Sequence, residues 1–195
     1  MTAEPARSRP VAQVVSDWLE PRIWVTVTSL LVGWQADGLA GAGWALLAVL
    51  GGTVLPALVI RHGVHRGKYA DRHLTDREQR LPILLFVVAS VAATLGLLAW
   101  AGAPRDVIAL TASMAVGITV VTIITAAWKI SIHCAVCAGG ATALVITFGP
   151  AVVPVYLLVV LACWSRVALR EHTPAQVIAG AAAGAASALI YLALR

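Results

Sequence analysis

Long apolar runs dominate this sequence and set the strongest limit on its fold. Seven of them follow one another along the chain, at residues 22–40, 43–60, 83–101, 105–127, 134–150, 151–164 and 174–194. A helix needs about 20 apolar residues to cross the roughly 30 Å hydrocarbon core of a bilayer, so most of these runs are long enough. Residues 134–164 must then form a tight hairpin around Gly149 and Pro150. The runs predict an all-α fold, a polytopic membrane helix bundle of six or seven transmembrane helices.

The remaining sequence leaves little room for a second domain. Hydrophobic residues make up 60% of the chain and charged residues only 12%, which is outside the range of soluble globular proteins. Residues 1–21 lack the apolar core of a signal peptide, and we expect them to form an N-terminal interfacial segment anchored by Trp18. Residues 22–195 are expected to form one membrane-embedded domain, in which 61–82 is the only long polar segment.

Small and sulfur-containing residues inside the apolar runs favour packing over chemistry. Cys134 and Cys137 form a Cys-x-x-Cys pair, but they lie with Cys163 in apolar surroundings, and an odd cysteine count argues against a disulfide framework. Gly180 and Gly184 have the small-xxx-small spacing of closely packed membrane helices.

Charged residues are expected to gather on one membrane face. With seven spans, the amino terminus and the segments 61–82, 128–133 and 165–173 all fall on the same side. The cations and histidines brought together there are Lys68, Arg72, Arg77, Arg80, Lys129, His133, Arg166 and His172. Arg105 and Arg195 are the basic residues on the other side. The positive-inside rule therefore predicts that the basic face is cytoplasmic, and we expect an integral protein of a prokaryotic plasma membrane.

This arrangement has the chemistry of an anion site. Arginine forks bind phosphate oxygens in a bidentate manner. Thr173 and Pro174 are favoured as the N-cap and first residue of a helix, whose free N–H groups would point back toward His172. Of two imidazoles beside a bound phosphate, one could attack phosphorus while the other protonates the leaving oxygen.

Two short motifs resemble signatures of a known superfamily. Ser165-Arg166, five residues and then His172 is similar to the third signature of the type 2 phosphatidic acid phosphatases, a superfamily that includes the vanadium haloperoxidases. Ser131-Ile132-His133, preceded by Lys129, resembles the second signature, which is usually Pro-Ser-Gly-His. The similarity covers about residues 61–185.

The resemblance implies a role for each matching residue. His172 would be the nucleophile that forms a phosphohistidine, His133 the acid for the leaving group, and Arg166 a catalytic phosphate ligand. The other phosphate-binding residues would be Lys68, Arg77, Arg80, Lys129, Ser131 and Ser165. No metal and no other cofactor is expected.

The chain also departs from the superfamily pattern. Lys68 is separated from Arg80 by more than the usual six residues, and Ile130 and Ile132 replace Pro and Gly. Gln176 stands where an aspartate is usual, four residues after the nucleophile; its amide oxygen could orient the imidazole but adds no negative charge. The His-Thr-x-x-Gln form resembles the dolichyl-diphosphate phosphatase branch, which favours a polyprenyl substrate.

We therefore expect an integral membrane phosphatase acting on a polyprenyl or glycerolipid phosphate or diphosphate, with its active face in the cytoplasm. Its partners would be the lipid substrate and the bilayer, with no nucleic acid, and a homo-oligomer remains open. Two alternatives are a Mg-dependent prenyltransferase, in which Asp71 and Asp76 would bind the metal, and a non-catalytic protein that binds or transports lipid headgroups.

Overall fold

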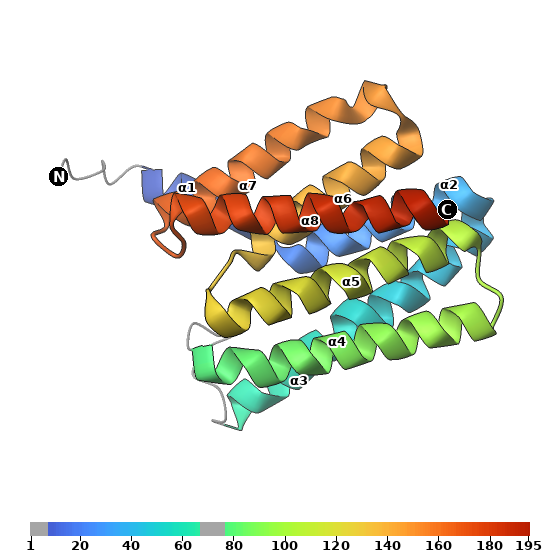
Figure 1. Ribbon diagram of the computed structural model, residues 1–195, viewed down its shortest axis with the longest axis horizontal. Helices are drawn as coiled ribbons and strands as arrows, with labels where there is room; N and C mark the ends of the chain where they lie inside the picture. The colour runs from blue at the N-terminus through green and yellow to red at the C-terminus, as the bar shows by residue number, and fades with distance from the viewer. Residues whose placement is uncertain (1–7, 67–76) are drawn as a thin grey trace.

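The computed structural model describes residues 8–66 and 77–195, and these residues form a bundle of helices with no strand among them (Figure 1). The elements are α1 (Ser8–Trp18), α2 (Pro21–Val49), the π-helix η1 (Leu50–Val54), α3 (Leu55–His65), α4 (Arg77–Trp100), α5 (Arg105–Ala127), α6 (Ile132–Phe148), the 3-10 helix η2 (Pro150–Val155), α7 (Tyr156–Ala168) and α8 (Pro174–Leu194). The prediction of an all-α fold is confirmed for the described part of the chain.

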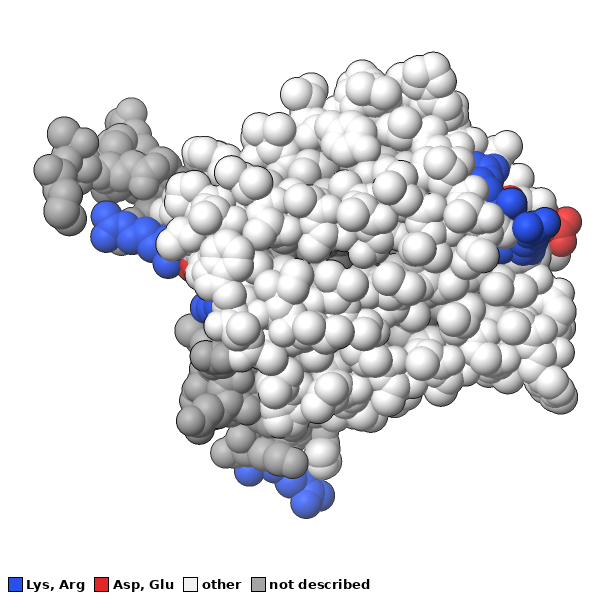
Figure 2. All heavy atoms as spheres, viewed as in Figure 1, with Lys and Arg blue, Asp and Glu red and all other residues white. Residues whose placement is uncertain are grey.

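The surface of the bundle is that of an integral membrane protein. Five helical segments are long and apolar enough to cross a bilayer, namely Pro10–Gly63, Leu81–Trp100, Arg105–Ala127, Pro150–Ala168 and Pro174–Leu194, and α6 is a shorter apolar helix. Figure 2 shows charged side chains at the two ends of the molecule and an uncharged belt between them. Trp18 and Trp100 are highly exposed, as expected for aromatic residues at the two membrane interfaces.

The long helix α2 folds back on itself at Asp37 and Gly38. Both residues have non-helical backbone angles, and Gly38 has a φ of 53°, which favours glycine. The two limbs then touch through glycines, because a Cβ atom placed on Gly41 would lie 2.0 Å from the Gly33 carbonyl oxygen. The turn thus comes a few residues before the break at 41–42 that the apolar runs indicate.

The hairpin predicted around Gly149 and Pro150 is confirmed. Helix α6 ends at Phe148, Gly149 adopts a φ of 81°, and η2 leads into α7, which returns beside α6. Glycine accepts this left-handed conformation without the cost of a Cβ clash, and the proline after it cannot continue the preceding helix.

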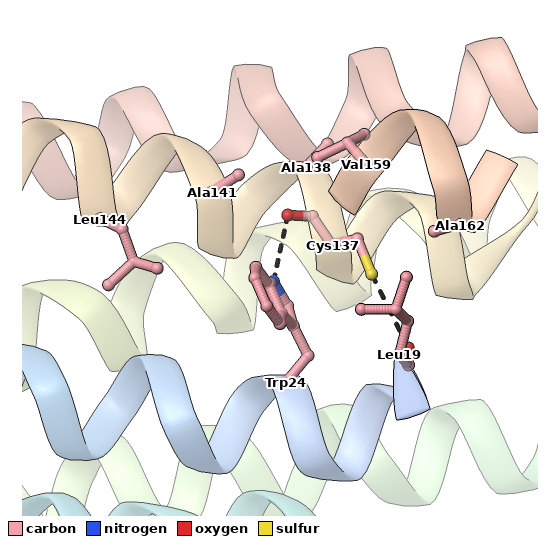
Figure 3. Close-up of a cluster of buried hydrophobic side chains, with 8 residues drawn as sticks. All are labelled: Leu19, Trp24, Cys137, Ala138, Ala141, Leu144, Val159 and Ala162. Atoms are coloured by element: carbon pink, nitrogen blue, oxygen red, sulfur yellow. Dashed lines mark hydrogen bonds between the residues drawn. The ribbon is translucent and has the colours of Figure 1, made fainter. Parts of the chain in front are cut away.

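The buried core is built around α6. Trp24 of α2 donates its indole N–H to the Cys137 carbonyl oxygen at 3.1 Å, and the Cys137 thiol contacts the Leu19 carbonyl oxygen (Figure 3). Cys134 and Cys137 are fully buried, and both are free thiols, as packing residues would be.

Helix α8 packs closely on the opposite side of α6. A Cβ atom on Gly180 would lie 2.4 Å from the Ser131 carbonyl oxygen, and one on Gly184 would lie 1.9 Å from that of Ala135. The two glycines therefore serve a contact inside this chain, and their small-xxx-small spacing gives no support to a homo-oligomer.

Candidate functional site

One end of the bundle collects the segments that carry the predicted site residues. Helices α4, α6 and α8 begin there, and α5 and α7 end there, with α1 beside them (Figure 1). Lys68 lies outside the described residues. Arg77 and Arg80 lie in the first turn of α4, where the structure describes only the backbone.

The loop between α7 and α8 ties Arg166 to His172 through the backbone. The Arg166 carbonyl oxygen accepts the Glu171 N–H at 3.1 Å and the His172 N–H at 3.3 Å, and the Arg170 N–H binds the Val167 carbonyl oxygen at 2.9 Å. This is the hydrogen-bond pattern of a Schellman motif, with Arg170 in the left-handed position at a φ of 58°. The five residues between the arginine and the histidine thus form a fixed turn.

A capping box fixes the start of α8. The Thr173 hydroxyl accepts the Gln176 N–H at 3.4 Å, and the Gln176 side-chain oxygen Oε1 accepts the Thr173 N–H at 3.0 Å. The Thr173 cap was predicted from the sequence; the reciprocal bond from Gln176 was not, although the Thr-x-x-Gln pattern indicates it.

Gln176 also contacts the histidine that precedes the helix. Its Oε1 lies 3.3 Å from Nδ1 of His172, whose side chain is buried. An amide oxygen is only an acceptor, so the tautomer that fits this contact carries its proton on Nδ1 and its lone pair on Nε2. This is the contact that the predicted orienting role of Gln176 requires.

The start of α6 is bonded to the start of α8. The Ser131 N–H donates to the Gln176 backbone carbonyl at 3.2 Å, and the Ser131 hydroxyl caps α6 by accepting the Cys134 N–H at 3.4 Å. His133, in the first turn of α6, and Lys129, just before it, are both half-buried. The Ser-x-His and Arg-x5-His motifs are therefore neighbours in space.

Arg166 has two partners that the sequence analysis did not name. Its side chain is only 6% exposed; Nη1 donates to the Ser16 hydroxyl at 2.7 Å, and Nη2 forms an ion pair with Glu171. Ser16 lies on the buried face of α1 with Ala12, and the buried Leu19 follows directly after the helix. The spacing of these three residues is that of one helix face, which is the signal that could have shown α1 packing against the bundle.

The two serines proposed as phosphate ligands lie in buried structural positions. Ser131 and Ser165 are fully buried. The Ser165 hydroxyl donates to the Ala162 carbonyl oxygen of its own helix at 2.8 Å, while Ser131 caps α6.

Within residues 8–66 and 77–195, no group of three or more histidine, cysteine or carboxylate side chains is placed to hold a metal ion. Asp71 and Asp76, the carboxylates of the prenyltransferase alternative, lie outside the described residues.

Searches against protein-family models, curated proteins and solved structures found no match to the chain. The features that bear on function are therefore those of the site itself. This contains a buried arginine, a histidine oriented by an amide oxygen, and a second histidine in the first turn of α6, all at one end of an apolar bundle.

Proposed function

We propose that the protein is a membrane phosphatase that hydrolyses a lipid phosphate or diphosphate, of the polyprenyl or glycerolipid class, through a phosphohistidine intermediate. The observation that carries the proposal is the hydrogen bond between the Ser131 N–H and the Gln176 carbonyl, which joins the segments of the two histidines. With the turn from Arg166 to His172, it brings the segments that carry Arg166, His172 and His133 to the same end of the bundle.

The proposed reaction has two steps. Nε2 of His172 attacks phosphorus, a phosphorus–nitrogen bond forms, and the bond to the leaving oxygen breaks as His133 donates a proton to that oxygen. Water then attacks the phosphohistidine while His133 accepts a proton, and phosphate leaves with His172 restored. Arg166 would stabilise the charge on the transferring phosphoryl group. Gln176 would hold the imidazole through Nδ1, with no negative charge to stabilise a cation.

The same proposal fixes the place of the site in the membrane. We take the two limbs of α2, the second continuing through α3, together with α4, α5, α6, α7 and α8 as seven passes. An odd number agrees with the positions of α1 and the carboxyl terminus at opposite ends of the bundle (Figure 1). The site lies at the end with most of the cations, so the positive-inside rule makes it cytoplasmic. A lipid substrate could insert its phosphate there while its tail stays in the bilayer.

Phosphate release from a panel of lipid phosphates tests the proposal directly. Purified protein should release phosphate from at least one polyprenyl or glycerolipid phosphate, should keep its activity in EDTA and should be inhibited by vanadate. Activity lost in EDTA and restored by Mg²⁺ would favour the prenyltransferase alternative. Binding of lipid phosphates without phosphate release would favour a headgroup-binding or transport protein.

Conservative variants test two proposed roles, that of Arg166 as a phosphate ligand and that of Gln176 in orienting His172. Arg166→Lys keeps the charge but loses the fork, so turnover should fall by about tenfold or more. Gln176→Asp should retain turnover, because a carboxylate also accepts from Nδ1, whereas Gln176→Leu should lower kcat more than it raises KM. Equal effects of Asp and Leu would remove the orienting role.

A further inference from the structure

The guanidinium of Arg166 lies between two ligands of very different exposure. Ser16 is 3% exposed, whereas the Glu171 side chain is 41% exposed. The buried ligand comes from α1, which packs against α7, and the exposed one comes from the turn that leads to His172.

This difference separates a permanent ligand from an exchangeable one. Moving Ser16 away from Arg166 would require α1 to leave α7, because the serine lies on the buried face of that helix. Moving the Glu171 carboxylate requires only rotation of an exposed side chain, since its backbone N–H already holds the turn by binding the Arg166 carbonyl. An incoming anion would therefore displace Glu171 and leave Ser16 in place.

A carboxylate bound to Arg166 competes with incoming anions and so weakens their apparent binding. It carries one negative charge, as does the phosphodiester of an ordinary phospholipid, whereas a terminal phosphate carries about 1.5 to 2 at pH 7. Phosphodiester lipids surround the site in large excess and would occupy an arginine that had no resident anion. A tethered carboxylate competes with them at a high effective concentration.

We propose that Glu171 is an internal competitor for Arg166, which a lipid with a terminal phosphate or diphosphate displaces and which lowers the occupation of this arginine by phosphodiester headgroups. This inference deepens the proposed function and rests on it. It differs from a purely structural role of Glu171, which would be to hold Arg166 in position, because a structural partner would lower kcat or stability when removed. A competing ligand, when removed, strengthens the binding of other anions.

The experiment compares the wild-type protein with Glu171→Gln in detergent micelles. Turnover of a long-chain polyprenyl monophosphate is measured with and without added phosphatidylglycerol. Without the phosphodiester, E171Q should lower KM by about fivefold, which is about 1 kcal/mol, with kcat unchanged. With it, the apparent KM of E171Q should rise by about fivefold, while that of the wild type should change by less than about twofold.

Glu20→Gln is the matched control. Glu20 pairs with Arg22 at the same end of the bundle, so E20Q removes the same charge and breaks an arginine pair without touching Arg166. It should behave as the wild type in both media. Glu171→Asp changes the same position but keeps the charge, and it should stay insensitive to phosphatidylglycerol. An effect seen in E171Q and not in E171D is then due to loss of the charge and not to the substitution itself.

An E171Q protein as insensitive to phosphatidylglycerol as the wild type, or one with lower kcat and unchanged KM, would overturn the inference while leaving the phosphatase proposal intact. If the wild type hydrolyses no lipid phosphate, the proposed function fails instead. Equilibrium dialysis with radiolabelled inorganic phosphate then tests Glu171 alone. E171Q must bind phosphate more tightly than both the wild type and E20Q, and equal binding overturns the inference.

Discussion

The two ends of the bundle both contain buried polar groups, but they use them differently. At the end that holds the carboxyl terminus, Asp106 accepts the Tyr191 hydroxyl and binds Nε of Arg195, each at 3.1 Å. Thr147 bonds to the same hydroxyl at 2.9 Å, and Arg195 donates to the Ile146 carbonyl at 2.7 Å. This network joins the ends of α5, α6 and α8. Its carboxylate, Asp106, and its arginine, Arg195, are exposed to a similar extent.

At the opposite end, the arginine is buried and its carboxylate is not. Arg166 is held by the buried Ser16 and the half-exposed Glu171, and the adjacent histidine is oriented by Gln176. Burial of polar groups in a membrane bundle is therefore not enough to mark a site. The distinguishing feature is a buried cation whose carboxylate partner is exposed.

The largest expected difference between the ends is in turnover. His172→Asn removes the proposed nucleophile and should lower phosphate release by about a thousandfold or more. Tyr191→Phe removes a fully buried polar group at the other end and should leave turnover within about twofold. Phosphate release and melting temperature are measured for both. A folded His172→Asn protein with normal turnover would contradict the proposal that the end with His172 is the catalytic one.

The second difference concerns the close contact that supports the site. A Cβ atom on Gly180 would lie 2.4 Å from the Ser131 carbonyl oxygen, so Gly180→Ala should force α8 away from α6. We expect a loss of about 2 kcal/mol in stability and of most of the turnover. Gly96→Ala is the control, because nothing lies within 4 Å of its Cβ position and alanine favours helix by roughly 0.5–1 kcal/mol. Equal melting temperatures for the two variants would contradict the packing argument.

Sequence reasoning reached the features that depend on local spacing. Apolar runs indicated the spans, Gly149 and Pro150 the hairpin, and four-residue spacing the contact between His172 and Gln176. Alternating loops placed the Ser131 and His172 segments at the same end.

Features that depend on which helices pack together were missed. Ser16 lies 150 residues before Arg166, and no local pattern links α1 to α7. Glu171 is close in sequence, but its ion pair requires the left-handed turn at Arg170, a conformation that an arginine does not signal. The precise turn in α2 also escaped, because Asp37-Gly38 lies within a glycine-rich run where several breaks are compatible with the sequence.

A smaller effect is expected at the end with the carboxyl terminus. Asp106→Asn weakens the bonds to Tyr191 and Arg195, and since Asp106 is partly exposed the loss should be about 1 kcal/mol. Turnover of the remaining folded protein should not change. Thermal unfolding in detergent measures the stability, and phosphate release is then measured per folded molecule. A lower turnover per folded molecule would show that this network contributes to catalysis and would weaken the distinction between the two ends.

A difference of similar size is expected at Arg170, in the turn beside the site. Its φ of 58° costs about 1–2 kcal/mol for residues with a side chain, and glycine avoids that cost. Arg170→Gly should therefore be more stable than Arg170→Ala by about 1 kcal/mol, while both lose the same charge. If the alanine variant melts at the same or a higher temperature, the turn is not under this constraint.

The packing of α8 on α6, across the intervening α7 in sequence, also sets an order of assembly during synthesis. Helix α6 and its hairpin partner α7 emerge from the ribosome before α8, so the bond from Ser131 to Gln176 cannot form until Pro174–Leu194 has entered the membrane. A nascent chain stalled after α7 would carry Arg166 and His133 but no oriented His172. The proposed site is therefore complete only after α8 has been synthesised.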